Sequence, residues 1–474
     1  MNILKKLLLA ALMFTLIFAA APFKTETATA KFLSQSKISG GLLETIDNTL
    51  TPQEVIVTFK TKERLNETHS SLLNHLGIKN GVLLNELPIA GVIATPDQIK
   101  RLAADDRVLS IYPNRKLQYE NETATDFTHV DQVRTDSSFM KKNGGFPVDG
   151  NGIGVVVNDS GVDGLHPDLQ YGSHLVQNVA AQTNLNALTT LLPITYAENV
   201  PNTDTTGGHG THVAGIVGAT GAMSGGKYEG VAPGADLIGY GSGAGIAILD
   251  VVGGFDYALT HQAEYNIRVI TNSWGDTSQA GAEFDPNDPI NIATKKLYDR
   301  GIVTVFSAGN SGPDMGTISG NYKKAPWVVT VAAGDAEGNL TDFSSRGIEG
   351  KTGTVTVDGE TWTWEDRPTV TAPGYKVIST RTLSPTPLLG ATDDIEMIEP
   401  GYLPYYTTMS GTSMAAPHVA GVIALMLDAN PELTPLQVKE ILQQTATPMD
   451  VSQWEAGAGY VNAYEAVMAA FSAQ

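Results

Sequence analysis

The chain has 474 residues, a formal net charge of −20 and no cysteine. This length predicts two or three domains, and the lack of cysteine excludes disulfides, thiolate metal sites and cysteine nucleophiles. Residues 31–119 carry 11 Lys+Arg and 9 Asp+Glu, a net charge of +2, whereas residues 120–474 carry 16 and 40, a net charge of −24. An acidic body of this kind repels nucleic acids and anionic membranes, so we expect neither as a partner.

The first 30 residues are typical of an export signal. Lys5 and Lys6 precede an apolar run over residues 7–21, and the tripeptide ATA at residues 28–30 offers a small-residue cleavage site. The competing site at residues 19–21 is disfavoured because Pro22 follows the bond. The alternative is a membrane anchor, but the run is shorter than the roughly 20 residues that a bilayer span needs. We therefore predict a signal peptide over residues 1–30 and a secreted, extracellular protein.

A compact unit follows within residues 31–119, from about residue 52. Its predicted elements are a strand over residues 54–60, a helix over 64–76, short strands over 81–87 and 89–94, and a strand over 108–112. Thr95 and Pro96 open a second helix, because threonine is a favoured cap and proline is favoured at the first helical position. The order βαββαβ is that of a small α+β sandwich. Residues 31–51 show no clear periodicity.

From about residue 150 apolar strands alternate with helices, which predicts an α/β domain with a parallel sheet and helices on both faces. The predicted strands are residues 153–158, 237–240, 269–271, 302–306 and 327–332, and the predicted helices begin near His209, Ile246, Asn287, Ser413 and Thr434. Alternating residues around Asp358 and Gly359 predict a hairpin insertion near residues 348–368.

Two motifs place an aspartate and a histidine at the edge of this sheet. The sequence DSG at residues 159–161 ends an apolar strand, where active residues of open α/β sheets lie. Asp163 is an alternative to Asp159, but it lies past the turn. The sequence HGTHVAG at residues 209–215 begins a helix, and its His209 and His212 invite a zinc interpretation. Zinc protease histidines are spaced i, i+4 with a glutamate between them, which this motif lacks.

Two further motifs supply a serine and an amide. Ser413 lies in GTSMAAPH at residues 411–418, where a serine is ordinarily a helix cap. A serine becomes a nucleophile when a histidine takes its proton and a carboxylate fixes that histidine, and all three residue types are present. Asn310 follows a strand on a glycine turn, so it is either a turn residue or a donor to an oxyanion.

In this order, the DSG, HGTHVAG and GTSMAAPH motifs resemble those of the subtilisin-like serine proteases. The resemblance runs from about residue 150 to 470, and it implies that Asp159 orients the base, His209 is the general base and acid, Ser413 is the nucleophile and Asn310 completes the oxyanion hole. It also implies an inhibitory propeptide over residues 31–119, a catalytic domain over residues 120–474 and self-cleavage of a zymogen near Tyr119. The implied activity is that of a secreted serine endopeptidase that forms an acyl-enzyme.

The family binds an extended peptide between two enzyme segments. The matching substrate-binding residues here are Ser242, Gly243, Ser273, Trp274, Gly275, Ala308, Gly309 and Gly320. Among them, the small residues Ser273, Gly275, Ala308, Gly309 and Gly320 form the pocket walls. They predict an apolar pocket for Phe, Tyr, Leu or Met before the cut bond, over Lys or Arg.

No cofactor is required for this chemistry, but family members often hold structural calcium. Asp168 matches a position that contributes a calcium ligand elsewhere, whereas residues 221–230 lack the expected cluster of Asn and Asp. Asp168 is therefore either a calcium ligand or a turn aspartate. The expected partners are protein substrates and the chain's own propeptide, with no nucleic acid and no membrane after signal removal. We expect the protein to be a monomer.

Three alternatives compete with this interpretation. A secreted non-catalytic binding protein on the same fold would be expected to lose Asn310 or one of the three catalytic residues, and none is lost. An esterase would carry a Gly-x-Ser-x-Gly elbow, which is missing around Ser413. A zinc peptidase fails on ligand spacing.

Overall fold

The computed structural model describes residues 37–115, 118–119, 128–181, 183, 185, 188–205, 207–243, 246–383 and 392–473. These residues form two compact units. Unit 1 lies within Met1–Leu84, Pro88–Asn114 and Leu185–Pro193, and unit 2 within Asn85–Leu87, Arg115–Asn184 and Ile194–Gln474. We describe each unit separately.

Unit 1 is a mixed sheet with helices, as the sequence predicts. Its strand order is β4 (Val108–Pro113), β1 (Gln53–Phe59), β3 (Ile89–Ala94), β2 (Gly81–Leu83) and β8 (Leu191–Pro193). Its helices are α3 (Gly40–Asn48), α4 (Glu67–His75) and α5 (Pro96–Ala104). Thr95 and Gln98 cap α5 reciprocally, so the helix begins where the sequence places it.

Two elements of unit 1 differ from the expectation. α3 lies in the stretch that shows no periodicity, yet its Leu42 and Ile46 are buried in the unit's core. β8 lies far along the chain and pairs in parallel with β2, from Gly81 opposite Leu191 to Leu83 opposite Pro193. A three-residue strand of this kind depends on its partner and leaves no periodicity in the sequence.

Unit 2 contains a seven-stranded, all-parallel sheet, which confirms the predicted fold class. The strand order is β16 (Val370–Pro373), β13 (Val328–Gly334), β12 (Val303–Ser307), β10 (Ile267–Asn272), β6 (Gly154–Asp159), β9 (Asp236–Gly241) and β7 (Leu175–Ala180). The five inner strands are the predicted ones. The two edge strands, β7 and β16, were not predicted.

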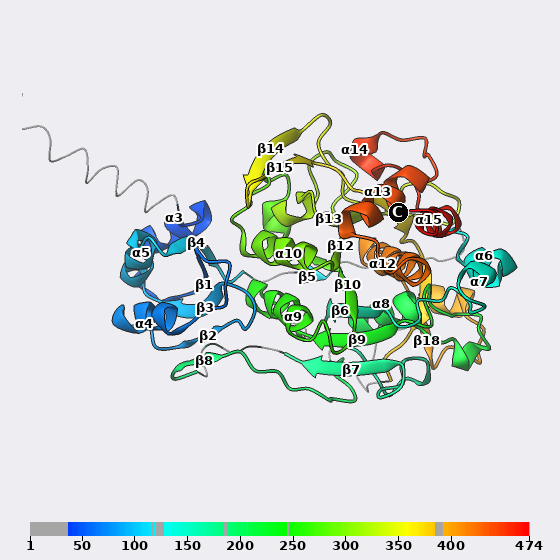
Figure 1. Cartoon of the computed structure of the whole chain (residues 1–474), viewed down its shortest axis with the longest axis horizontal. Helices are drawn as coiled ribbons and strands as arrows, with labels where there is room; N and C mark the ends of the chain where they lie inside the picture. The colour runs from blue at the N-terminus through cyan, green and yellow to red at the C-terminus, as the bar shows by residue number, and fades with distance from the viewer. Residues whose placement is uncertain are drawn as a thin grey trace, which may run out of the picture. The chain divides into compact units, whose positions relative to one another are not determined.

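Helices cover both faces of this sheet (Figure 1). α8 (His209–Gly218) and α12 (Thr412–Ala429) pack on one face, where Val155 and Val157 of β6 join their core. α9 (Ile248–Thr260) and α10 (Pro289–Asp299) pack on the other, where Asn158 donates to the Val251 carbonyl of α9. α12 is long and apolar enough to cross a membrane, but 89% of it is buried inside the protein, so it is a core helix.

The remaining elements surround the sheet. β14 (Thr352–Val357) and β15 (Glu360–Glu365) form a hairpin across Asp358 and Gly359, whose φ angles of 54° and 86° suit a two-residue turn. β17 (Val377–Thr380) pairs with β18 (Tyr406–Met409), and β5 (Gln118–Tyr119) pairs with β11 (Trp274–Gly275). The other helices are α6 (Val130–Thr135), α7 (Ser137–Lys142), α11 (Thr392–Met397), α13 (Pro435–Thr445), α14 (Gln453–Ala456) and α15 (Ala463–Ala470).

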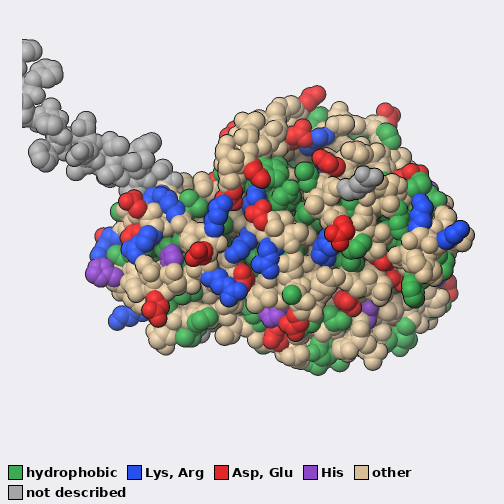
Figure 2. All heavy atoms as spheres, viewed as in Figure 1, with side chains coloured by type: hydrophobic (Ala, Val, Ile, Leu, Met, Phe, Trp, Pro, Cys, Tyr) green, Lys and Arg blue, Asp and Glu red, His purple; other side chains and the backbone are tan. Residues whose placement is uncertain are grey.

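Charged side chains are dispersed on the face shown in Figure 2, where lysines and arginines lie between the acidic residues. The negative charge of residues 120–474 is therefore not gathered into a single acidic patch on this face.

Candidate active site

Asp159 and His209 form a buried pair. Asp159 is the last residue of β6, and its Oδ1 accepts hydrogen bonds from His209 Nδ1 at 2.6 Å and from the Ser160 N–H at 2.7 Å. Because a carboxylate only accepts, Nδ1 carries the proton, and Nε2 of a neutral imidazole is left as the acceptor. This is the tautomer that a general base needs.

The start of α8 is fixed by contacts that leave no room for larger side chains. Asp204 accepts hydrogen bonds from the Gly208 and Thr211 N–H groups at 3.0 and 3.2 Å, and burial raises its pKa. A Cβ atom on Gly210 would lie 2.2 Å from the Gly161 carbonyl oxygen. The glycine after His209 therefore permits the close approach of α8 to the turn after β6.

Asp204 was missed by the sequence analysis. Its signal was a carboxylate just before a predicted helix start, because negative charge is favoured near the N-terminus of a helix. The competing aspartate, Asp163, instead binds the Thr382 hydroxyl and the Leu383 N–H. It is a structural residue and does not take the place of Asp159.

Five further histidines bind hydroxyl or backbone groups and have structural roles. His212 Nε2 donates to the Val377 and Thr407 carbonyls at 3.1 and 3.2 Å, and burial lowers its pKa to about 3. Since that nitrogen already faces carbonyl oxygens, the arrangement does not fit a zinc ligand. Similar bonds hold His166, His174, His261 and His418.

Ser413 is the second residue of α12, which packs against α8. Its side chain is buried, and its hydroxyl donates to the Ser273 carbonyl over a long 3.3 Å. The first N–H groups of a helix have no acceptor within the helix, so the Ser413 N–H is directed outward from the helix start. A hydroxyl and a backbone donor thus lie together at one helix N-terminus.

Asn310 is oriented by Thr412. Its Oδ1 accepts from the Thr412 N–H at 2.9 Å and from the Thr412 hydroxyl at 3.0 Å. Since a backbone N–H only donates, it must face the amide oxygen, and the Asn310 NH₂ group is turned to the opposite side. Within the described part of the chain both hydrogen bonds of the Asn310 side chain use its oxygen, so the NH₂ group is available as a donor. Thr412, which the sequence analysis missed, is thus a positioning residue.

The predicted substrate segments lie beside these groups. The Ser242 and Gly243 N–H groups donate to the Asp159 and Ser160 carbonyls at 2.9 and 3.1 Å. Trp274 and Gly275 pair in antiparallel fashion with Tyr119 and Gln118, respectively, so one edge of the site holds an extended strand. The Trp274 indole is fully buried and donates to the Asn158 carbonyl, so this residue offers its backbone to the site.

The other predicted substrate-binding residues, Ala308, Gly309 and Gly320, lie close together in unit 2. The Ser319 N–H donates to the Ala308 carbonyl at 3.1 Å, and a Cβ atom on Gly309 would lie 2.8 Å from the Ser319 hydroxyl. Gly320, at φ 116°, follows directly. The predicted pocket walls at Ala308–Gly309 and Gly320 are therefore adjacent.

Asp168 does not fit a calcium ligand. It is fully buried, its Oδ1 accepts from the Met223 N–H at 3.0 Å, and its Oδ2 accepts from the Tyr406 hydroxyl. Both oxygens are thus taken up by protein donors. No group of three or more His, Asp or Glu residues suited to a metal ion occurs within the described residues.

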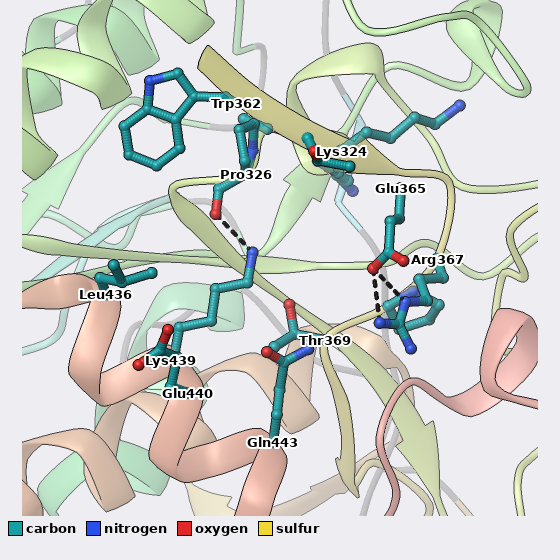
Figure 3. A pocket seen from close by; sticks show the side chains of 14 residues that line it. Lys324, Pro326, Trp362, Glu365, Arg367, Thr369, Leu436, Lys439, Glu440 and Gln443 are labelled. Atoms are coloured by element: carbon teal, nitrogen blue, oxygen red, sulfur yellow. Dashed lines mark hydrogen bonds and ion pairs between the residues drawn. The ribbon is translucent and has the colours of Figure 1, made fainter. Parts of the chain in front are cut away.

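A cavity of about 260 Å³ lies apart from these groups, between residues 323–326, β15 and α13 (Figure 3). None of the predicted site residues lines it. Its Lys439 Nζ donates to the Pro326 carbonyl at 2.8 Å, and burial lowers the pKa of Lys439 to about 8.

The site combines a serine at a helix N-terminus, a histidine held by an aspartate, and an amide donor, at the carboxyl edge of a parallel sheet. These features define a serine protease site of the α/β class. Comparison with known proteins agrees: residues 150–461 match the subtilase family model. The chain is 32% identical to the serine protease AprX of Bacillus subtilis over 81% of this chain and 80% of that protein. It is 30% identical to subtilisin E of the same species over 66% of this chain and 65% of that protein. The chain belongs to the subtilase family and is a subtilisin-like serine protease.

Solved structures share the fold. Fervidolysin from Fervidobacterium pennivorans aligns with a TM-score of 0.60 and 21% identity over 89% of this chain and 62% of that one. A psychrophilic protease, S41, aligns with a TM-score of 0.51 and 26% identity over 72% of this chain and 99% of that one. Subtilases act on proteins and need no cofactor for catalysis.

Proposed function

We propose that the protein is a secreted serine endopeptidase, made as a zymogen, with Asp159, His209 and Ser413 as its catalytic residues. The observation that carries this proposal is the 2.6 Å bond from His209 Nδ1 to Asp159, because it leaves Nε2 as the acceptor for a serine proton. The family membership supports the same roles.

In the proposed reaction, Ser413 Oγ attacks the carbonyl carbon of the cut bond while His209 Nε2 takes its proton. The oxyanion accepts hydrogen bonds from the Asn310 NH₂ group and the Ser413 N–H. His209 then gives its proton to the departing amine, which leaves an acyl-enzyme. A water molecule, deprotonated by His209, then attacks the ester carbonyl. His209 returns this proton to Ser413 Oγ as the ester bond breaks, which releases the second product and restores the serine.

We further propose that residues 31–119 are an inhibitory propeptide that is cut near Tyr119. The antiparallel pairing of Gln118 and Tyr119 with β11 supports this, because a substrate of the enzyme would bind as the same kind of added strand. Asn85–Leu87, also within the proposed propeptide, groups with unit 2, where the Asp256 carboxylate accepts their three N–H groups at 2.6–3.2 Å. The export signal at residues 1–30 supports secretion, although it lies outside the described residues.

Labelling with a serine-directed fluorophosphonate followed by peptide mapping tests the nucleophile. We expect the label on Ser413, and we expect Ser413→Ala to remain a folded, unlabelled precursor with its N-terminal region attached, because the triad acts as a unit. A Ser413→Ala protein that still processes itself would contradict the assignment.

N-terminal sequencing of the mature wild-type protein tests the cleavage site. The expected new terminus is at or next to Glu120. A mature terminus beyond Gly150, or a fully active protein that is never cut, would refute the proposed self-processing.

A further inference from the structure

An ion pair joins the chain just before β5 to the residue that directly follows β11. Arg115 Nε lies 2.8 Å from Asp276 Oδ2, and both residues belong to unit 2. The side chain of Arg115 is 25% exposed and that of Asp276 is 5% exposed. Salt and water screen a partly buried pair less than an exposed one, so this contact can distinguish a charged partner from an uncharged one.

The carboxylate of Asp276 is held in place by its own turn. Its Oδ1 accepts from the N–H and the hydroxyl of Ser278, which caps the short 3-10 helix Thr277–Gln279. Oδ2 is left to Arg115, the one cation that pairs with Asp276 within the described residues. Without Arg115 a buried, charged oxygen would have no partner, which is costly. The carboxylate is therefore oriented to receive a cation.

A second buried aspartate lies close to the same arginine. Asp288 is 1% exposed, and its carboxylate accepts from the Ile290 N–H and from the Asn321 amide, both at 2.9 Å. Burial raises the pKa of Asp288 to about 6, whereas its hydrogen bonds and the nearby charge of Arg115 act in the opposite direction. The guanidinium of Arg115 thus lies in the field of two carboxylates, and a negative side chain in its place would be repelled.

The backbone places Arg115 on the path of the strand that occupies the site. The Arg115 carbonyl accepts from the Ile248 N–H of α9 at 3.0 Å, and Tyr119, four residues further on, pairs with Trp274. Because β5 and β11 are antiparallel, the residue after β11 faces the chain that enters β5. A substrate strand bound in the same register would bring its own side chain to Asp276.

We infer that Asp276 is a specificity-determining residue that selects substrates with arginine at the upstream position, four residues before the one that takes the place of Tyr119. Once the N-terminal region has left, the substrate arginine replaces Arg115 at Oδ2. A glutamine there carries no charge and binds more weakly, and a glutamate meets two aspartates and is rejected. The inference rests on the proposed function and adds a substrate preference.

The test compares kcat/KM of the mature enzyme for three peptides with the sequence of residues 113–123, PNRKLQYENET, that carry Arg, Gln or Glu in place of Arg115. Mass spectrometry of the products verifies that the same bond is cut in each. The wild-type enzyme should cleave the arginine peptide about 10-fold faster than the glutamine peptide, as expected for one hydrogen bond between charged groups. The glutamate peptide should be the slowest of the three.

Two variants separate this contact from the general attraction of an acidic protein for a cationic peptide. Asp276→Asn keeps an oxygen for Ser278 but loses the charge, so the Arg-to-Gln ratio should fall to near one. The matched control is Glu432→Gln, which removes an exposed carboxylate beyond the C-terminal end of α12, whereas Ser413 lies at the N-terminal end. It should keep the wild-type ratio.

Three outcomes would overturn the inference. They are a wild-type enzyme that cleaves the three peptides equally fast, an Arg-to-Gln ratio unchanged in Asp276→Asn, and a ratio that falls as far in Glu432→Gln. The first needs no variant, so the inference stays testable if Asp276→Asn fails to mature. Fluorophosphonate labelling separates the two levels: an enzyme that is labelled at Ser413 and cleaves the peptides without this preference contradicts only the role of Asp276, whereas absence of both labelling and cleavage contradicts the proposed function.

Discussion

Ser273 and Ser413 exchange two hydrogen bonds between side chain and backbone. Ser273 Oγ donates to the Ser413 carbonyl at 2.8 Å, and Ser413 Oγ donates to the Ser273 carbonyl at 3.3 Å. The first bond has a clear cause: Pro417, four residues further along α12, has no N–H to donate to the Ser413 carbonyl. Ser273 satisfies the group that the proline leaves open, and so ties the proposed substrate segment to the proposed nucleophile.

Ser273→Ala should therefore lower kcat several-fold with a smaller effect on KM, because the nucleophile is less firmly held. Leaving a buried carbonyl unsatisfied should also reduce the free energy of unfolding by about 1–3 kcal/mol. Steady-state kinetics and urea unfolding measure the two effects. Ser273→Thr, which keeps the hydroxyl, should recover part of both, and an Ala variant with a raised KM and an unchanged kcat would contradict the positioning role.

Asn310→Ala should reduce kcat by about 10²–10³-fold while barely changing KM, which is the loss that removal of such a donor causes in subtilisin. The amide meets the substrate oxygen fully only when that oxygen carries negative charge. Thr412→Val removes the hydroxyl that orients Asn310 and should give a smaller loss of the same kind. If KM rises while kcat holds, Asn310 binds the ground state instead.

Tyr406→Phe should destabilise the protein by about 1–3 kcal/mol, because it leaves one oxygen of the buried Asp168 carboxylate without a donor. Removal of calcium with EDTA should not reproduce this loss, since protein groups occupy both oxygens of Asp168. Thermal unfolding of the inactive Ser413→Ala protein, with and without EDTA, measures both effects. A large EDTA effect that disappears in Asp168→Ala would show that Asp168 is a calcium ligand.

Stability should fall in acid partly because of His418. Burial penalises its charged form and lowers its pKa from 6.5 to about 3. Between these values the unfolded chain binds a proton that the folded protein does not, so this contribution to stability is intact above pH 6.5 and is lost as the pH falls towards 3. In the Ser413→Ala background, His418→Gln should flatten this dependence by up to about 1.4 kcal/mol per pH unit.

Tryptophan fluorescence suits this measurement, because all five tryptophans lie in residues assigned to unit 2. The exposed His129 offers a matched control, and His129→Asn, which tolerates the positive φ of that position, should leave the slope unchanged. An unchanged slope in His418→Gln would contradict the linkage.

The central strands of the unit 2 sheet could be predicted because a strand buried on both faces is a continuous apolar run. The edge strands could not. β7 carries Gln177 and Asn178 inside the protein, where they bind other polar groups, and the four-residue β16 ends in Pro373. Both patterns are typical of loops when only the sequence is considered.

The residues of the candidate site divide in the same way: the sequence indicates some of them, and only the structure indicates the others. The sequence singles out Asp159, His209, Ser413 and Asn310 because glycines and small residues surround each of them. Asp204 and Thr412 act through other residues, so their roles depend on tertiary geometry.

The pairing of β2 with β8 joins residues from both sides of the proposed cut near Tyr119. Breaking one peptide bond there would leave these strands hydrogen-bonded, so cleavage and dissociation are separate events. The cut protein would persist as a two-chain complex until this ladder opened. Maturation would then depend on two rates: the rate of peptide-bond cleavage at Ser413 and the rate at which this short strand pair separates.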